Sequence, residues 1–166
     1  MHKRVGVVLI LLFAFFGIAD SAYLAQHELS GAPLICNIEY LSGCNVVAQS
    51  PYSHLLGIPL AEYGILFYAI VFVLAALELV IFDRILRRAL QGLAAIGVLA
   101  SICFTLLQVL VIGALCIYCL TSAIIALLIF VFATFIEPLR ALEKSAPPVH
   151  EPARSTPPPF RMPPSA

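Results

Sequence analysis

Long apolar stretches separated by short polar ones dominate this chain and predict helices that cross a membrane. The first stretch covers residues 5–24 and the second covers residues 60–82. Each is close to the roughly 20 residues that a helix needs to cross about 30 Å of hydrocarbon at 1.5 Å per residue. We therefore predict two transmembrane helices in the first half of the chain.

A third apolar stretch, residues 89–136, is about twice as long as one crossing requires. It predicts two helices, 89–111 and 115–136, that fold back on each other at a turn near Gly113. The predicted fold class is an all-α integral membrane protein, a four-transmembrane-helix bundle over residues 1–136.

Two segments have a different composition. Residues 26–59 contain repeated Gly and Pro, which is typical of a loop, and they form the only sizeable loop on their side of the bundle. Residues 137–166 are rich in Pro and poor in large apolar groups, so we expect a disordered or extended tail without a soluble domain.

Composition and charge support the membrane assignment and orient it. The chain is 62% hydrophobic and 11% charged, with a mean hydropathy of +1.05, which excludes a water-soluble globule. No Lys or Arg lies within residues 18–63, although this segment holds Asp20, Glu28, Glu39 and Glu62. The positive-inside rule then predicts cytoplasmic termini and an outside loop.

The first apolar stretch also has features of a secretory signal peptide, because it follows Lys3 and Arg4. A cut after Ala22 would put Asp20 at the third position upstream, where a small residue is required. We expect an uncleaved helix; cleavage would leave three spans and the same chemistry.

Five cysteines are the candidate reactive groups. Cys116 and Cys119 form a CxxC motif where the fourth predicted helix begins, and the unpaired amides and positive dipole at a helix start stabilise a thiolate. As alternatives, two cysteines at this spacing can be packing residues or metal ligands. Cys103 lies in the third predicted helix, where we expect it to pack as a small apolar residue.

Cys36 and Cys44 lie eight residues apart in the loop, and Gly43 gives the backbone freedom to fold between them. They could form an inert disulfide that staples the loop. They could instead exchange disulfides with the CxxC motif, since exchange proceeds by thiolate attack through mixed disulfides. Two pairs on one side of the membrane favour a relay.

Electrons that reach the CxxC motif need an acceptor. The sequence has no CxxCH or GxGxxG motif, and its four histidines are not spaced as a ligand set. A lipid quinone that diffuses between the helices is the acceptor that remains, and no metal site is expected.

The order of these motifs resembles the vitamin K epoxide reductase (VKOR) family. The DsbB-type quinone reductases have similar chemistry, but there the CxxC motif precedes the spaced pair. The motifs that carry the resemblance are Gly17 to Leu24, Cys36, Cys44, Ser50-Pro51-Tyr52-Ser53, Gly57-Ile58-Pro59, Gly64 and Cys116-Ile117-Tyr118-Cys119.

The resemblance implies a four-helix bundle around a quinone, with the loop as its cap. Cys119 would donate electrons to the quinone, and Cys116 would be its partner and the target of Cys44. Cys36 would exchange with an outside thiol protein. The hydroxyl of Ser50 would hydrogen-bond a quinone oxygen.

Two positions depart from the animal epoxide reductases. Ala123 stands where they have a tyrosine, and Leu60 stands where they have an asparagine, and both of those residues contact the quinone carbonyls there. The departures favour a bacterial-type homologue that has no fused thioredoxin-like domain in this chain.

We therefore predict a membrane thiol:quinone oxidoreductase that reduces ubiquinone or menaquinone and oxidises a separate thioredoxin-fold, DsbA-like protein, in a bacterial inner membrane with its site facing the periplasm. The alternatives are a vitamin K epoxide or quinone reductase and a thiol-based transporter of a soft metal ion. Four polar residues stay open. Gln108 is a helix contact or a quinone ligand, and Glu62 is an interfacial residue or part of a proton path. His27 and His54 are surface residues of the loop, or either one supplies a proton to the reduced quinone.

Overall fold

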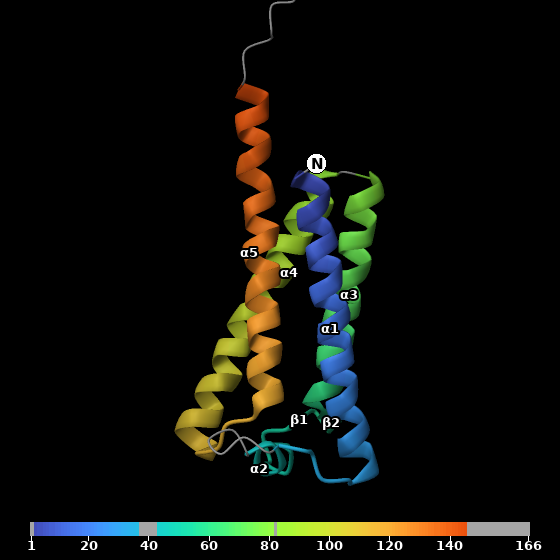
Figure 1. Cartoon of the computed structure of the whole chain (residues 1–166). Coiled ribbons are helices and arrows are strands. Elements are labelled where there is room, and N and C mark those ends of the chain that lie inside the picture. The colour runs from blue at the N-terminus through green and yellow to red at the C-terminus, as the bar shows by residue number, and fades with distance from the viewer. Residues whose placement is uncertain (1, 37–42, 82, 146–166) are drawn as a thin grey trace, which may run out of the picture.

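A computed structural model describes residues 2–36, 43–81 and 83–145 of the chain (Figure 1). The described elements, in chain order, are α1 (His2–Ser30), α2 (Cys44–Ala48), β1 (His54–Leu55), β2 (Ile58–Pro59), α3 (Leu60–Ile81), α4 (Arg84–Leu107), the π-helical turn η1 (Gln108–Ile112) and α5 (Ile117–Ser145).

Four helical segments are long and apolar enough to cross a membrane: Val5–Ser30, Leu60–Ile81, Arg84–Ile112 and Ile117–Phe135. They run along one axis as a bundle, with α2 and the small β-hairpin gathered at one end (Figure 1). We call this the loop end, and the opposite end, where α4 begins at Arg84, the basic end. The predicted four-helix membrane bundle is confirmed.

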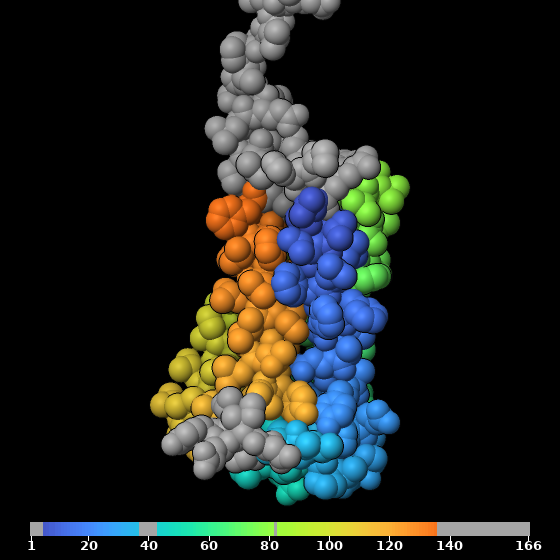
Figure 2. All heavy atoms as spheres, in the orientation of Figure 1, coloured from blue at the N-terminus to red at the C-terminus, as the bar shows by residue number. Residues whose placement is uncertain are grey.

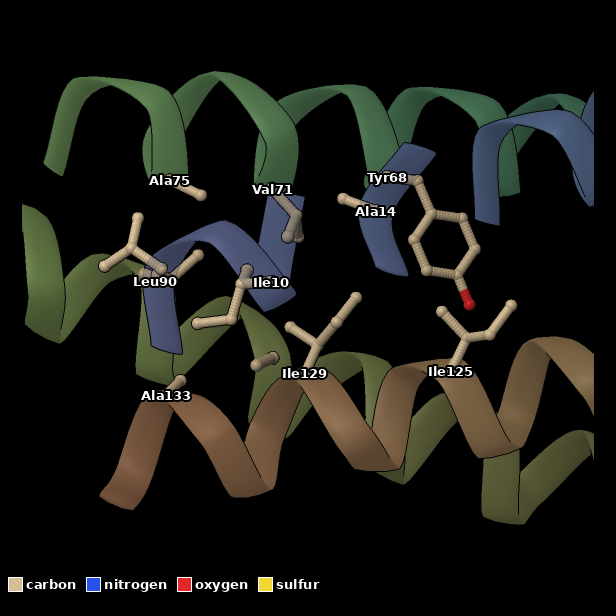
Figure 3. Packing of buried hydrophobic residues seen from close by; sticks show 11 residues of the cluster. Ile10, Ala14, Tyr68, Val71, Ala75, Leu90, Ile125, Ile129 and Ala133 are labelled. Carbon is tan, nitrogen blue, oxygen red and sulfur yellow. The ribbon is translucent and has the colours of Figure 1, made fainter. Parts of the chain in front are cut away.

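The core of the bundle lies between α1, α3 and α5, with α4 packed on α5 and α3. The side chains of Ile10, Tyr68, Leu90 and Ile129 are almost fully buried there (Figure 3). Small residues permit this close packing: a Cβ on Gly17 would lie 2.5 Å from the Tyr68 ring. Close approach over small residues is a common way for helices to associate within a bilayer.

Large apolar side chains cover the outer surface of the bundle. Phe15, Phe16, Leu66 and Leu110 are each more than half exposed. On the side of the bundle that Figure 2 shows, α1 and α5 lie next to each other and form this surface. An apolar surface of this extent suits contact with lipid rather than water.

The turn predicted near Gly113 is confirmed, and its geometry explains it. Gly113 has a φ of +68°, and its N–H donates to the carbonyl of Gln108. The left-handed conformation ends the helix, and glycine adopts it without steric cost.

Three predicted boundaries are wrong by several residues. α1 continues to Ser30 and ends before Gly31, whose φ is +67°. The basic residues after Asp83 form the first turn of α4, because the Asp83 side chain accepts the N–H of Ile85 at 3.2 Å and caps the helix. α5 continues over residues 137–145, which are mostly good helix formers; residues 146–166 of the predicted tail lie outside the described part.

A charged pair that the sequence analysis missed lies within the bundle near its basic end. Arg87 of α4 donates to Glu78 of α3, and the two residues are only 7% and 2% exposed. Burying two charges is costly unless they are paired. The pair therefore fixes the α3–α4 contact at this end.

Candidate functional site

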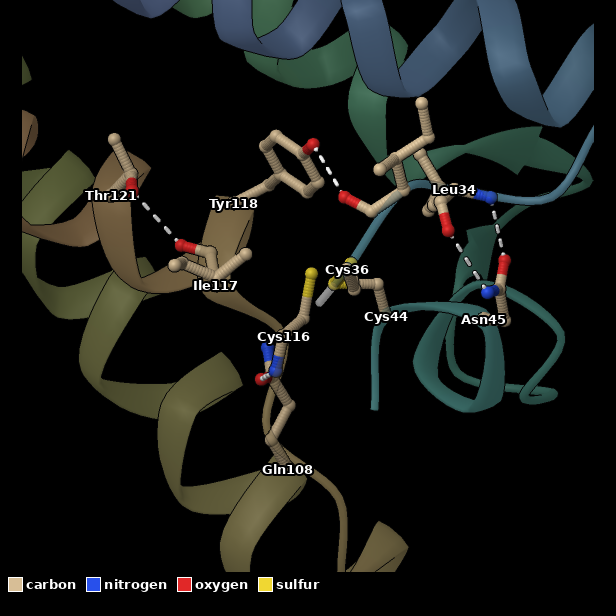
Figure 4. Close-up of a disulfide and its surroundings, with 10 residues drawn as sticks. Leu34, Cys36, Cys44, Asn45, Gln108, Cys116, Ile117, Tyr118 and Thr121 are labelled. Carbon is tan, nitrogen blue, oxygen red and sulfur yellow. Dashed lines mark hydrogen bonds between the residues drawn. A yellow bond between two sulfur atoms is a disulfide. The ribbon is translucent and has the colours of Figure 1, made fainter. Parts of the chain in front are cut away.

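The two cysteine pairs belong to one packed cluster at the loop end of the bundle, where Cys36 and Cys44 lie beside Cys116 (Figure 4). Cys36 and Cys44 are joined by a disulfide, whereas Cys116 and Cys119 are free thiols. Cys44 and Cys116 are fully buried and belong to one packed cluster, which also includes Leu34. The loop pair is thus oxidised and lies against a reduced CxxC motif.

Backbone and side-chain hydrogen bonds hold the loop in this position. The Asn45 side chain accepts the N–H of Leu34 at 2.8 Å and donates to the Leu34 carbonyl at 3.2 Å. This two-way contact links the segment before Cys36 to the short helix α2, which begins at Cys44. The Tyr118 hydroxyl adds a bond to the Ile35 carbonyl at 3.0 Å.

Gly43 has a different role from the one we expected. Its φ of −78° is open to any residue, so backbone freedom is not what the position requires. A Cβ here would lie 2.8 Å from the Cβ of Ala114 and 2.9 Å from the Leu115 carbonyl oxygen. Gly43 therefore allows the loop to touch the backbone just before the CxxC motif.

The CxxC motif stabilises a thiolate on its first cysteine. The thiol of Cys119 donates to the Cys116 sulfur, and this hydrogen bond lowers the pKa of Cys116 from an ordinary 9.0 to about 7. The N–H groups of Cys119 and Tyr118 act in the same direction, while burial and the Asp20 carboxylate oppose them. A low pKa makes a thiolate available near neutral pH and also makes that sulfur a better leaving group.

Gln108 supports the motif from the π-helical turn. Its side-chain oxygen accepts the N–H of Cys116 at 3.0 Å, and the residue is 4% exposed. The sequence analysis left Gln108 as a helix contact or a quinone ligand. The observed bond makes it a positioning residue for Cys116.

A large cavity begins beneath the loop and extends between the helices. Its volume is about 940 Å³, within the range typical of small-molecule sites. Its wall is mostly apolar and is formed by the loop end together with α1, α3, α4 and α5, with thiol, hydroxyl and amide groups among the lining residues. The polar and sulfur-bearing side chains in the wall include Ser50, Tyr68, Gln108, Cys116, Cys119 and Ser122.

Comparison with known families assigns the chain. The family model described as the vitamin K epoxide reductase family matches residues 8–134, which is most of the membrane bundle.

The chain belongs to the VKOR family.

A search of curated proteins found no match. The family assignment confirms the resemblance drawn from the motifs, and it makes the protein a VKOR-type membrane oxidoreductase.

Ser50, the residue that the motif resemblance assigns to the quinone, lies at the cavity wall. Ser50 is half-buried, and its hydroxyl donates to the Val47 carbonyl at 2.7 Å. A hydroxyl in this position can turn toward the cavity by giving up one local bond. The two positions that differ from the animal enzymes carry apolar side chains. Leu60 lines the cavity at the start of α3, and Ala123 is half-buried on α5.

Cys103 and Glu62 are not part of the thiol site. Cys103 is exposed on the outer surface of α4, so our prediction that it packs inside the bundle is wrong. A thiol behaves as a small apolar group, so it suits the apolar surroundings of the bundle as well as its core. Glu62 is exposed in the first turn of α3.

Two polar groups at the site were missed. The Tyr68 hydroxyl donates to the Ser122 carbonyl at 2.8 Å and also contacts the Ser122 hydroxyl, and both residues line the cavity. Asp20 has one carboxylate oxygen that is buried without a hydrogen-bond partner among the described residues. An acidic residue in an apolar span was itself a signal, but the sequence analysis gave Asp20 no role in the site.

Proposed function

We propose that the protein forms disulfides by passing electrons from an outside dithiol protein to a lipid quinone. One observation carries the proposal: an oxidised loop pair is packed against a reduced CxxC motif that forms part of the wall of a large apolar cavity. Each pair is then ready for its own reactant, a thiol protein for the loop and a quinone for the CxxC motif.

In the proposed reaction, the partner's thiolate attacks Cys36, and Cys44 leaves as a thiolate. The partner's second thiolate then releases the partner as a disulfide. This leaves Cys36 and Cys44 reduced. The partner has lost two electrons, and the loop pair has gained them.

The loop pair next reduces the CxxC disulfide that formed when the previous quinone was reduced. Cys44 attacks Cys116, and Cys119 leaves as a thiolate; Cys36 then attacks Cys44, and Cys116 leaves. The lowered pKa of Cys116 favours its departure at neutral pH. The cycle returns to the arrangement of an oxidised loop and a reduced CxxC motif.

The cavity residues fit a quinone. A quinone accepts two electrons and two protons at its oxygens, and the ring with its isoprenoid chain requires an apolar space with few polar groups. Cys119 supplies electrons and Ser50 a neutral donor in this proposal, and both line the cavity. The quinone type, ubiquinone or menaquinone, follows from the membrane that holds the protein.

The proposed partner is a thioredoxin-fold, DsbA-like protein. This partner arrives at the outside face with its two thiols reduced. It must have become reduced by oxidising other proteins. The basic end holds Arg84 and Arg88, and the positive-inside rule favours placing this end in the cytoplasm of a bacterium. The loop end would then face the periplasm, where disulfides persist.

Two other functions compete. Epoxide reduction would use the same thiols, but Leu60 and Ala123 offer no hydrogen bond to the substrate. Soft-metal transport needs thiols along a path through the bilayer, and the deep Cys103 lies on the outer surface of α4. Both observations favour quinone reduction.

The test is a spectroscopic titration of the purified protein with ubiquinone and menaquinone analogues, followed by turnover with a reduced DsbA-like protein. We expect quinol and partner disulfide in equal amounts. Quinone reduction that needs only a small dithiol, with no oxidation of any thioredoxin-fold protein, would contradict the proposed partner. A failure to reduce either analogue would contradict the function.

A further inference from the structure

A chain of polar side chains leads from the surface of the loop end into the cavity wall. It consists of Glu28 on α1, His54 on β1 and Ser53 just before it, and all three line the cavity together with Ser50. None of the three belongs to the thiol relay. The site already has its electron donors, so this chain would supply something other than electrons.

The hydrogen bonds define a direction. The Ser53 hydroxyl donates to the Ser50 carbonyl at 2.8 Å and lies 2.9 Å from His54 Nδ1. Because the Ser53 hydroxyl donates to Ser50, its oxygen accepts the hydrogen bond from the ring, so His54 Nδ1 carries the hydrogen. The chain thus leads from the imidazole to the hydroxyl that stands next to Ser50.

The far side of the ring faces a carboxylate. His54 Nε2 lies 3.4 Å from Glu28 Oε1, too long for a strong hydrogen bond but close enough to orient the ring. That carboxylate oxygen is buried and has no hydrogen-bond partner among the described residues. The His54 side chain is 47% exposed, so the same ring also reaches the outside water.

Two other titratable groups, Glu62 and Tyr63, act on neighbours of His54. Glu62 lies close enough for its charge to act on Glu28, and the Tyr63 hydroxyl donates to the carbonyl of Leu55, next to His54 in the chain. Both come from the start of α3. Neither takes part in the hydrogen bonds that lead from His54 through Ser53 to Ser50.

The proposed function creates a need that this chain could meet. Disulfide exchange carries electron pairs as thiolates, so the protons of the partner's two thiols stay in the outside water. A reduced quinone must still receive two protons inside the cavity. The Cys119 thiol holds one proton, and Cys116, with a pKa of about 7, is about half thiolate at neutral pH, so protons must also come from outside the motif.

We propose that His54 supplies these protons through the hydroxyl of Ser53, with Glu28 orienting the ring. The inference rests on the proposed function and deepens it. His54 in its doubly protonated form gives the Nδ1 proton to Ser53 Oγ, and the hydroxyl proton of Ser53 moves to an oxygen of the reduced quinone. His54 is left neutral and takes a proton from the outside water, which readies it for the next transfer.

The test compares His54→Gln with His27→Gln. His27 also lines the cavity at the same end of the bundle, but its ring lies at a tilt against that of Tyr23 and its Nδ1 contacts the Ala32 carbonyl, outside the path from Glu28 to Ser53. We expect His54→Gln to reduce quinone on the order of 10²-fold more slowly with a small dithiol, the usual contribution of one positioned acid. Added imidazole should restore much of the rate, and His27→Gln should match wild type.

A second arm uses Ser53 and tests the path itself. Ser53→Ala should slow the reaction to a similar extent, while Ser53→Thr keeps the hydroxyl and most of the rate. In the quinone-free protein, nitrogen NMR of labelled histidine should show the His54 Nδ1 resonance moving in Ser53→Ala and the Nε2 resonance moving in Glu28→Gln. Peptide mapping of the Cys36–Cys44 disulfide confirms that each variant keeps the loop intact.

The outcomes separate the two proposals. If wild type reduces no quinone analogue, both the function and the proton path are wrong. If wild type is active and His54→Gln is equally fast, or slow but unmoved by imidazole, the path alone is wrong. A slow, imidazole-rescued His54→Gln together with the two NMR shifts supports it.

Discussion

The N–H of Gly43 donates to the carbonyl of Leu115 over 3.1 Å, which joins the cysteine loop directly to the backbone before the CxxC motif. This contact brings Cys44 to Cys116, and Gly43 permits it because it has no side chain. The first prediction concerns this contact.

Gly43→Ala should keep the Cys36–Cys44 disulfide but separate the loop from Cys116. A displacement of about 1 Å between reacting groups can cost on the order of 10²-fold in rate, and we expect a loss of that size in electron transfer from the loop to the CxxC motif. This rate is measured by stopped flow, with quinone as the oxidant and the reduced partner protein as the source of the dithiol. Gly92→Ala is the matched control, because a Cβ there meets no atom within 4 Å.

Cys119→Ala should trap a Cys44–Cys116 disulfide. Without the resolving thiol, the Cys116 thiolate attacks Cys44 and Cys36 leaves, with no net change in oxidation state. Mass mapping of non-reduced peptides identifies the linkage, and Cys103→Ala serves as the control that changes nothing. A loop disulfide that stays between Cys36 and Cys44 in the trap variant and throughout turnover would reduce the pair to a staple.

The thiolate of Cys116 should titrate with a midpoint near pH 7, the value to which the Cys119 hydrogen bond lowers its pKa. Below this pH the sulfur is protonated, and above it the thiolate absorbs in the ultraviolet. The measurement needs a background with Cys36 and Cys44 replaced by Ala, so that Cys116 stays free. Adding Cys119→Ala should move the midpoint upward toward 9.0; an unmoved midpoint would show that another group lowers the pKa.

Ser50→Ala should slow quinone reduction by about 10- to 1000-fold, by analogy with the loss of one preorganised donor. The variant also loses the bond to the Val47 carbonyl, worth about 1 kcal/mol, so the amount of protein in the membrane should be nearly unchanged. Thr121→Ala removes a hydroxyl that bonds only within α5 and is the control. Equal turnover in Ser50→Ala and wild type would remove Ser50 from the site.

Removing one member of the Glu78–Arg87 pair should destabilise the bundle by about 3–5 kcal/mol, because an uncompensated charge stays buried. Thermal unfolding in detergent should show this loss for Glu78→Leu and for Arg87→Leu. The double variant should recover much of it, since apolar residues can fill the same space. Arg88→Leu, at an exposed position, should change little.

The lengths of the apolar stretches and the position of Gly113 made the fold predictable. The four spans follow from stretch lengths, and the turn at Gly113 follows from the excess length between residues 89 and 136. Helix ends were harder, because Asp83 and Gly31 act through local capping geometry that hydropathy does not contain. The short helix α2 and the hairpin of β1 and β2 depend on contacts with the rest of the loop end, so the sequence pattern did not reveal them.

The site was predictable where chemistry and motif order agree. Cys36, Cys44, Cys116 and Cys119 were assigned as two pairs, and they meet as expected. What could not be predicted is which neighbours tune them. Gln108 reaches Cys116 only because a π-helical turn and a tight break bring residues eight apart together, and Glu78 meets Arg87 only when α3 and α4 fold side by side.

In the π-helical turn η1, the identity of the side chains and the number of residues are subject to different requirements. Val109, Leu110 and Val111 point outward and are each more than half exposed, so any apolar side chain of similar size satisfies them. Their number is a different matter, because adding or removing one residue would rotate Gln108 away from the Cys116 amide. The stretch should therefore tolerate substitution but not insertion or deletion, because its length places Gln108 whereas its side chains only face outward.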